Sequence, residues 1–334
     1  MAHHIVAIEA VHCPIPSFNL PSPHTIDIYN WTYESELADR VKDATIIITT
    51  TIKLPAHVLD PKVTPKLRLI AIMASGTDCF DKAVAKARGI TVCNCPGTNV
   101  DSVSEHVIGL YFTTRRKVVH LHNISATVPE DSTRDTEWKT KGSLRGHLRM
   151  PDGKAPLLCS DETMGIIGYG ALGKRIEVLA RALGMKVLVA ERRGVAPRAG
   201  RVSFEDALRT STVLVLCAPR SPETMNLIST EELRMMSPLA VLINVARGGI
   251  VDEQALLDAL VQGEIYGAAL DVFLNEPIGR GDSPLLCPEA NSLNLVLSPH
   301  MAWYAEKTLQ NLQDSVKHVV ERWCDGETVN QLEF

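Results

Sequence analysis

A Gly-x-Gly-x-x-Gly pattern, set between a short apolar run and a helical stretch, constrains this chain more than any other feature. Residues 165–167 lead into it, and its glycines are Gly168, Gly170 and Gly173. In a turn from strand to helix, the first glycine permits the tight turn, the second admits a pyrophosphate to the backbone, and the third lets helix and strand pack closely. The pattern predicts a dinucleotide site at a helix N-terminus, where N–H groups and the helix dipole hold phosphate.

An acidic residue stands where such a site would meet the adenosine ribose. Residues 185–190 predict the next strand, and Glu191 follows at roughly the 20-residue spacing typical of NAD sites. A carboxylate there binds the ribose 2′-hydroxyl and repels the 2′-phosphate of NADP. Arg192 and Arg193 come next, and they either pair with such a phosphate or are solvated surface charges. We therefore predict NAD as the cofactor, with some use of NADP.

Composition and charge exclude several classes of protein. The 334 residues are enough for about two domains, and the net charge of −5 indicates no nucleic-acid partner. No apolar run reaches the ~18 residues of a membrane span, and the first residues lack a signal-peptide pattern. Among the eight cysteines only Cys93 and Cys95 are close, at a spacing that does not match zinc ligation. We expect a cytoplasmic protein with reduced cysteines, no metal site and no membrane partner.

Short β-branched runs alternate with helical patterns along the chain, which predicts parallel sheets. The predicted strands of a first α/β unit are 5–8, 44–50, 67–72 and 90–93. Six further strands, enough for a complete doubly wound sheet, are predicted at 164–167, 186–190, 213–217, 240–245, 267–272 and 295–297. A long helix is expected from Asp101 toward His122, with Ser102 and Glu105 as its capping box. A final amphipathic helix is expected over 306–325.

Three polar side chains come directly after predicted strands of the second unit: Arg247, Glu276 and His300. Because ligands bind outside the carboxyl ends of such strands, we expect the three to converge on one crevice. An imidazole can give a proton to a carbonyl oxygen, a nearby carboxylate favours its protonated form, and a guanidinium holds a carboxylate through two hydrogen bonds. Each residue alone is more often a packing or solvated group, but together they suit hydride chemistry on a carbonyl.

Three longer segments, 244–252, 269–277 and 298–300, resemble the signature segments of the D-isomer-specific 2-hydroxyacid dehydrogenases. The resemblance extends from about Ala44 to the last helix. It implies two doubly wound parallel-sheet α/β domains with a cleft between them, one Rossmann-type and one flavodoxin-like. The implied boundaries are 1–100 plus 302–334 for a discontinuous substrate-binding domain and 101–301 for the NAD-binding domain, with 120–161 as a dimerisation arm of a homodimer.

The resemblance also implies roles for individual residues. Arg247 would bind the carboxylate and carbonyl of the substrate, His300 would be the acid/base, and Glu276 its carboxylate partner. The backbone N–H groups of Ser75 and Gly76 would hold the substrate carboxylate, although a plain turn after a strand is the other interpretation. Asp271 would lie near the nicotinamide amide. The expected cofactor-binding residues are Gly168, Tyr169, Gly170, Ala171, Leu172, Gly173, Glu191, Arg192, Arg193, Cys217, Ala218, Pro219, Val245, Ala246, Asp271 and His300.

We therefore predict reversible reduction of a small 2-keto acid to a D-2-hydroxy acid with NAD(P)H. Residues 298–303 are similar to the segment in glycerate dehydrogenase and hydroxypyruvate reductase members, which favours hydroxypyruvate or glyoxylate. Phosphite dehydrogenases carry a lysine where Ser75 stands, so that activity is disfavoured. The alternative from another class is a non-catalytic, NAD(H)-sensing binding protein resembling the C-terminal-binding corepressors, which keep the same three polar residues.

Overall fold

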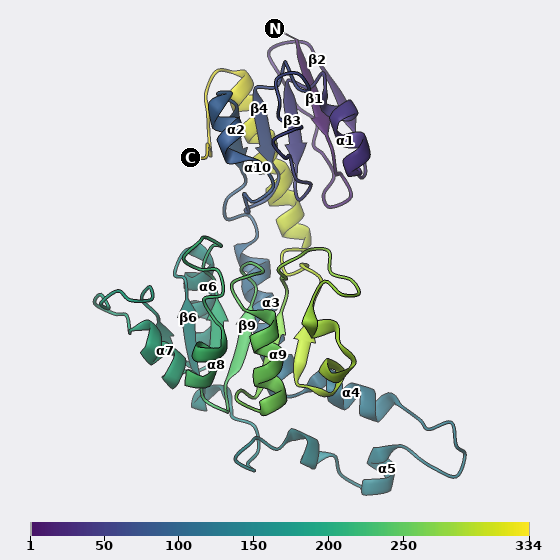
Figure 1. The fold of residues 1–334 in the computed structure, drawn as a ribbon, viewed down its shortest axis with the longest axis vertical. Helices are drawn as coiled ribbons and strands as arrows, with labels where there is room; N and C mark the ends of the chain where they lie inside the picture. The colour runs from purple at the N-terminus through teal and green to yellow at the C-terminus, as the bar shows by residue number, and fades with distance from the viewer. Residues whose placement is uncertain (1, 334) are drawn as a thin grey trace. The chain divides into compact units, whose positions relative to one another are not determined.

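The computed structural model describes residues 2–333, which divide into two compact units (Figure 1). The first unit takes the residues up to Asn99 and those from Tyr304 onward, and the second is Val100–Trp303. Each unit is built on its own parallel sheet with helices packed around it (Figure 1). The predicted fold class, two parallel-sheet α/β domains, is confirmed.

The sheet of the first unit has five strands in the order β2-β1-β3-β4-β5. These are β1 (His3–Ala7), β2 (His24–Ile28), β3 (Ile46–Thr49), β4 (Leu69–Ile72) and β5 (Thr91–Asn94). Strands β3 and β4 are buried along their whole length, which explains why every residue in them except Thr49 is apolar. The order is that of flavodoxin-like doubly wound sheets, in which ligands bind at the carboxyl edge.

Strand β2 was not predicted from the sequence. It pairs in parallel with β1 over five residue pairs, yet most of its side chains are exposed. An edge strand of this kind needs no continuous apolar run, so its pattern gave no signal. The helices of this unit are α1 (Glu34–Val41), α2 (Lys82–Ala87) and α10 (Glu306–Cys324). Helix α10 is the amphipathic helix predicted at the end of the chain, and it packs against β4 and β5.

The sheet of the second unit has six strands in the order β11-β10-β9-β8-β6-β7. All six were predicted, and they are β6 (Thr163–Ile167), β7 (Lys186–Val189), β8 (Val213–Leu216), β9 (Val241–Asn244), β10 (Gly267–Leu270) and β11 (Leu295–Leu297). The chain passes from β6 to β7 on one side and then returns to β8 on the other. Such a reversal leaves a crevice at the carboxyl end of the first strand, here β6.

The helices of the second unit are α3 (Val100–Arg115), α4 (Val118–Ala126), α5 (Glu137–Lys141), α6 (Ala171–Ala182), α7 (Phe204–Thr210), α8 (Thr230–Met235) and α9 (Glu253–Gln262). No helix among residues 2–333 is both long and apolar enough to cross a membrane. Segment 127–161, in which the sequence shows no strand or long helix, contains only α5 and two short 3-10 turns.

Two predictions about α3 are wrong. The helix begins at Val100, so Ser102 lies in its first turn, and the Ser102 hydroxyl donates to the carbonyl of Trp303 at 3.1 Å instead of capping the helix. The helix also does not reach His122. It ends at Arg115, because Lys117 adopts a left-handed conformation (φ 46°) from which α4 begins. Left-handed backbone cannot continue a right-handed helix.

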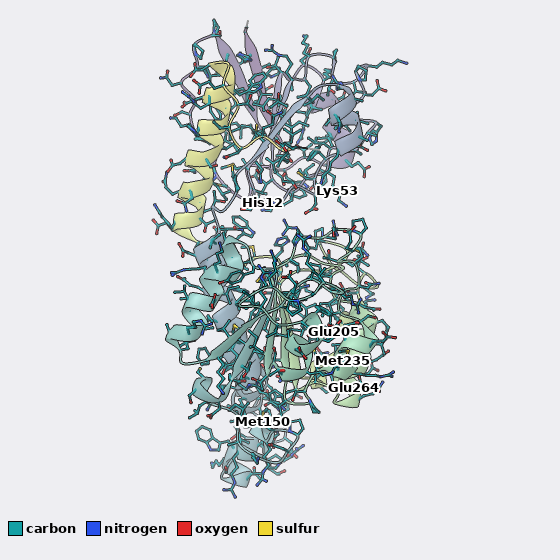
Figure 2. All side chains as sticks on the ribbon, turned by 90° about the vertical axis from the view of Figure 1, so that its left-hand side faces the viewer. His12, Lys53, Met150, Glu205, Met235 and Glu264 are labelled. Atoms are coloured by element: carbon teal, nitrogen blue, oxygen red, sulfur yellow. The ribbon has the colours of Figure 1, made fainter. Side chains whose placement is uncertain are left out.

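A buried ion pair closes the amino edge of the second sheet. The Arg115 guanidinium donates to both carboxylate oxygens of Glu162, at 2.6 and 3.0 Å, and also to the carbonyls of Thr212 and Leu239. Both side chains are at most 1% exposed. Met150, at the same edge in Figure 2, lies with its sulfur 3.9 Å from the same guanidinium. One arginine thus ties α3 to the residues that precede β6, β8 and β9.

Candidate active site

The glycine-rich turn lies at the carboxyl end of β6 and packs directly on the end of β8. Gly168 has φ +93°, and a Cβ added there would lie 2.5 Å from the backbone nitrogen of Ala218, so both conformation and space require glycine. The backbone N–H of Cys217 donates to the carbonyl of Ile167 at 2.7 Å. The structure therefore brings together the turn and the Cys217–Ala218 segment, both of which were predicted to bind the cofactor.

The N-terminus of α6 is open where the turn meets it. Gly170 is the N-cap residue and no side chain caps the helix, while a Cβ added at Gly170 would meet nothing within 4 Å. A Cβ at Gly173 would instead lie 2.4 Å from the carbonyl oxygen of Gly168, which is the close helix–strand packing expected of the third glycine. These residues fit the pyrophosphate of a dinucleotide, because free N–H groups at a helix N-terminus bind anions.

The loop after β9 fixes Arg247. The side-chain amide of Asn244 donates to the carbonyl of Arg247 at 3.0 Å and accepts from the N–H of Ala246 at 3.1 Å. A Cβ added at Gly248 would lie 1.7 Å from the carbonyl oxygen of Phe273, so the loops after β9 and β10 touch at that glycine. Val245 and Ala246 are buried, and Arg247 remains partly exposed.

His300 and Glu276, from the loops after β11 and β10, form a hydrogen-bonded pair. The imidazole Nδ1 lies 2.6 Å from Oε2 of Glu276, and Oε1 accepts from the N–H of Phe273 at 2.8 Å. Burial alone would raise the pKa of Glu276, but the hydrogen bond and charge of His300, the Phe273 N–H and the charge of Arg247 together hold that pKa below its usual range. Because Nδ1 is bound to Glu276, Nε2 is the ring nitrogen left for a ligand.

Asp271 holds the loop that carries His300. Its carboxylate is 1% exposed, accepts from the N–H groups of Met301 and Ala302 at 3.0 Å each, and accepts from the Ser298 hydroxyl at 2.6 Å. His300 has a left-handed backbone conformation (φ 54°), which a non-glycine residue holds only when its surroundings enforce it. Asp271 therefore positions the His300 loop, and the predicted contact with a nicotinamide amide stays a prediction.

In the first unit, Ser75 and Gly76 follow β4 at the carboxyl edge of the sheet. The Ser75 hydroxyl lies 3.1 Å from the carbonyl of Cys95, and its carbonyl accepts from Asn94. Neither Ser75 nor Gly76 donates a backbone hydrogen bond within the described chain. His12 and Lys53 lie at the same edge of this unit (Figure 2). Two adjacent free N–H groups are what a carboxylate ligand requires, as predicted for this turn.

The residues expected at the ribose end have partners that the sequence analysis did not single out. Glu191 follows β7, but its carboxylate is bound by Arg198, with contacts of 2.6 and 2.9 Å. The guanidinium of Arg193 pairs with Glu232. The sequence signal for these ion pairs is the cluster of arginines between residues 192 and 201, which a short sequence motif does not reveal.

Comparison with known proteins identifies the family. A family profile described as "D-isomer specific 2-hydroxyacid dehydrogenase, NAD binding domain" matches residues 128–302. Glycerate dehydrogenase of Methylorubrum extorquens is 40% identical over 326 residues, covering 97% of this chain and 96% of that protein. The chain belongs to the D-isomer specific 2-hydroxyacid dehydrogenase family.

Other members of the family agree with this assignment. Hydroxypyruvate reductase of Blautia hydrogenotrophica is 30% identical, covering 88% of this chain and 87% of that protein. The D-lactate dehydrogenase of Aquifex aeolicus, solved with NAD and lactic acid, is 25% identical with a TM-score of 0.74 and covers 91% of this chain and 90% of that chain. This 2-hydroxyacid dehydrogenase is thus an oxidoreductase with an NAD-binding domain in its second unit.

Proposed function

We propose that this family member reduces a small 2-keto acid, of the hydroxypyruvate or glyoxylate type, to a D-2-hydroxy acid. The observation that carries the proposal is the 2.6 Å pair of His300 and Glu276 at the sheet edge that also holds Arg247 and the glycine-rich turn. The names of the relatives, which include glycerate dehydrogenase and hydroxypyruvate reductase, support the substrate class. These names describe oxidoreductases, so the non-catalytic corepressor-like alternative is not favoured.

The chemistry divides between the cofactor and the residues of the chain. Bound NAD(P)H supplies a hydride to the keto carbon. His300 gives the proton from Nε2 to the carbonyl oxygen, and Glu276 holds the ring in place through its hydrogen bond with Nδ1. Arg247 holds the substrate carboxylate through its two-pronged guanidinium, assisted by the N–H groups of Ser75 and Gly76. In the reverse direction neutral His300 accepts the proton.

We also propose the division of labour between the units. The first unit, with Ser75–Gly76, is the substrate-binding domain, and the second is the NAD-binding domain that provides His300, Glu276 and Arg247. The free state of all eight cysteines among residues 2–333 supports a reducing cytoplasmic location.

Initial rates with glyoxylate, hydroxypyruvate, pyruvate and bulkier aryl or branched keto acids test the activity through loss of reduced-nicotinamide absorbance. We expect the highest kcat/KM with hydroxypyruvate or glyoxylate. His300→Ala should lose about 10²–10⁴-fold in rate while still binding dinucleotide. His57→Ala, at an exposed histidine of the first unit, is the matched control and should leave the rate unchanged. Negligible turnover of every acid alongside tight NADH binding would instead support the binding-protein alternative.

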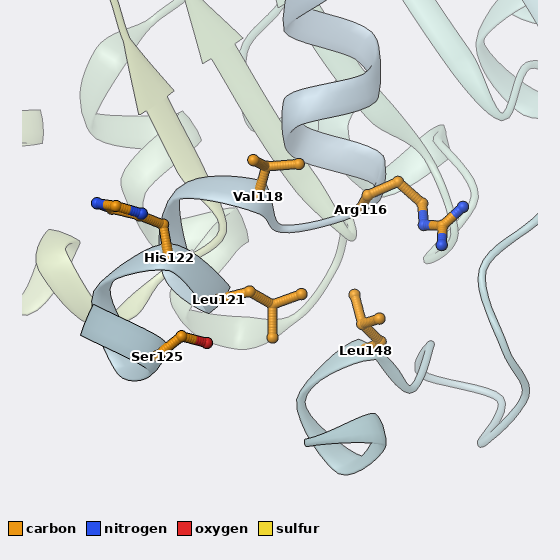
Figure 3. Close-up of a pocket in the computed structure, with 6 residues that line it drawn as sticks. All are labelled: Arg116, Val118, Leu121, His122, Ser125 and Leu148. Atoms are coloured by element: carbon orange, nitrogen blue, oxygen red, sulfur yellow. The ribbon is translucent and has the colours of Figure 1, made fainter. Parts of the chain in front are cut away.

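We propose that segment 120–161 mediates homodimerisation. Helix α4, which leads into this segment, has no buried residue. Val118 and Val119, just before the segment, are about half exposed, and Trp138 within it is 59% exposed. Figure 3 shows Leu121, Val118 and Leu148 around a hollow beside α4. Exposed apolar side chains gathered on one segment mark an interaction site, and a second copy of this chain is the occupant we propose.

Sedimentation velocity tests the homodimer. The sedimentation of the wild-type protein should correspond to twice the mass of one chain. In Leu121→Glu the measured mass should shift toward that of the monomer. Val261→Glu changes an exposed valine of α9 outside this segment and should leave the mass unchanged. A wild-type monomer at micromolar concentration would exclude the proposed dimer.

A further inference from the structure

Helix α3 contacts both ends of the loop that carries His300. The helix packs against β9, β10 and β11, and Figure 1 shows it beside β9. At the start of the loop, the imidazole Nε2 of His106 lies 3.1 Å from the hydroxyl oxygen of Ser298. One helical turn earlier, Ser102 donates to the carbonyl of Trp303 at the end of the loop. Because residues four apart share one face of a helix, a single face of α3 holds the loop from Ser298 to Trp303.

The directions of the hydrogen bonds around Ser298 follow from its single hydroxyl hydrogen. Ser298 donates this hydrogen to Oδ1 of Asp271 at 2.6 Å, because a carboxylate can only accept. The Ser298 oxygen can therefore only accept from His106, so the hydrogen between these two residues belongs to Nε2 of the imidazole. The three side chains thus form one directed chain of hydrogen bonds from α3 to Asp271, and such bonds polarise one another.

Asp271 depends on this chain because it is a buried carboxylate. It is 1% exposed, and its other side-chain hydrogen bonds come from the backbone N–H groups of Met301 and Ala302. In the part of the chain that the structure describes, its one ionic partner is His106, whose Nε2 lies 3.7 Å from Oδ1. A buried carboxylate is costly unless it is hydrogen-bonded and paired. Removing His106 would therefore leave Asp271 without its basic neighbour and Ser298 without a donor.

The position of Asp271 in turn sets the position of His300. Met301 and Ala302, whose N–H groups bind the Asp271 carboxylate, directly follow His300 in the chain. The backbone N–H of His300 donates to the carbonyl of Asp271 at 2.8 Å. Contacts of this kind enforce the left-handed backbone of His300. A shift of the Asp271 carboxylate would therefore move the loop and change where the His300 imidazole points.

We propose that His106 is a positioning residue for the proton transfer. Acting through Ser298 and Asp271, it fixes the loop in the geometry from which His300 gives its proton to the keto oxygen. The inference rests on the proposed reductase activity, and it assigns a role to a histidine that does not carry the transferred proton.

The other proposed contacts of the ligands lie on different loops. Arg247 follows β9, the Ser75–Gly76 turn follows β4, and the glycine-rich turn follows β6. Loss of His106 should therefore slow the chemical step while the binding of keto acid and dinucleotide is unchanged. A general weakening of the fold would instead affect rate and binding together.

Single turnovers followed by stopped flow test the proposal on the whole protein, because loss of reduced-nicotinamide absorbance then reports hydride transfer apart from product release. In His106→Ala we expect this rate to fall about tenfold, the effect of losing one hydrogen bond, with KM for keto acid and Kd for NADH unchanged. His106→Leu keeps much of the side-chain volume without a donor and should lose the same rate. His106→Gln, which can place an amide donor near the position of Nε2, should recover most of it.

A double-mutant cycle tests the path through Ser298. Ser298→Ala removes both hydrogen bonds of the serine and should slow the step at least as much as His106→Ala does. The double variant should be no slower than Ser298→Ala alone, because that change already breaks the chain. His318→Ala, at an exposed histidine of α10, is the matched control and should change no constant.

The outcomes separate this inference from the proposed function. Wild-type rates in His106→Ala and His106→Leu, a parallel loss of NADH binding, or additive losses in the double variant overturn the role of His106 and leave the proposed reductase intact. Absence of turnover with every keto acid in the wild-type protein overturns both.

Discussion

The two edges of the second sheet each hold a carboxylate paired with a basic side chain, in opposite surroundings. At the amino edge Arg115 and Glu162 are at most 1% exposed, and the arginine also donates to two backbone carbonyls. At the carboxyl edge the side chains of His300 and Glu276 are 40% and 31% exposed, and Nε2 of the imidazole makes no hydrogen bond to residues 2–333. A similar pairing of charges therefore contributes rigidity at one edge, whereas at the other edge it forms the proposed proton donor and its partner.

Solvation explains the difference. A fully buried pair must satisfy every donor and acceptor internally, because an unpaired charge there is costly. A half-exposed pair keeps one group directed to solvent, so it can exchange a proton with a ligand. If this comparison is right, variants at the amino edge change stability and variants at the carboxyl edge change catalysis.

The largest effect is expected at the amino edge. Arg115→Ala leaves Glu162 buried without its counter-charge, so the free energy of unfolding should fall by about 3–5 kcal/mol in urea titration. Arg234→Ala breaks a surface pair with Glu264 and should cost less than about 1 kcal/mol. If Arg115→Ala lowered the free energy of unfolding no more than Arg234→Ala does, the proposed difference between the two edges would be wrong.

A smaller effect is expected where the loops of the carboxyl edge touch. Gly248→Ala places a methyl group against the carbonyl of Phe273, which should cost about 1–3 kcal/mol of stability and raise the KM for keto acid by displacing Arg247. Gly109→Ala is the matched control, because that helical position has no neighbour within 4 Å and alanine should stabilise α3 by about 0.5–1 kcal/mol. Equal stability of both variants would show that the loop contact is unimportant.

The smallest effect in free energy is expected at the carboxylate partner of the proposed proton donor. Glu276→Gln should reduce kcat by about 10–100-fold, a part of the ~10²–10⁴-fold that a positioned acid/base contributes. The lowered pKa of Glu276 means that the carboxylate is charged throughout the neutral range, and its contribution is lost only as the pH falls through that lowered value. In the variant, the decline of kcat/KM that accompanies protonation of Glu276 at acid pH should be absent. Identical acid limbs in the pH profiles of wild type and variant would show that the charge of Glu276 does not contribute to the rate.

Local patterns predicted most of the fold. The buried strands of both sheets read as apolar runs, and glycines and caps marked several helix ends. The exposed edge strand β2 gave no such signal. The break at Lys117 was also missed, because the apolar pattern continues through it and no glycine or proline marks the turn.

The candidate site was predicted unevenly for a similar reason. Arg247, Glu276 and His300 lie directly after strands, so knowing the parallel sheet places them on one edge. The supporting contacts of Asp271 with Met301 and Ala302 join residues about thirty positions apart, and no spacing rule reveals them. Arg198 was not predicted as a site residue, because its role depends on hydrogen bonds to Glu191 that form only in the folded chain.

The sequence by itself determined the parallel-sheet architecture, the glycine-rich turn and the identity of the polar side chains at the strand ends. Its periodicities and turn residues act over a few positions, and that is the range over which a sequence pattern can be interpreted. The tertiary structure decided which charges are neutralised by which partners. Burial and long-range pairing set whether a carboxylate such as Glu191 or Glu162 serves a ligand or the fold, because both depend on residues that only folding brings together.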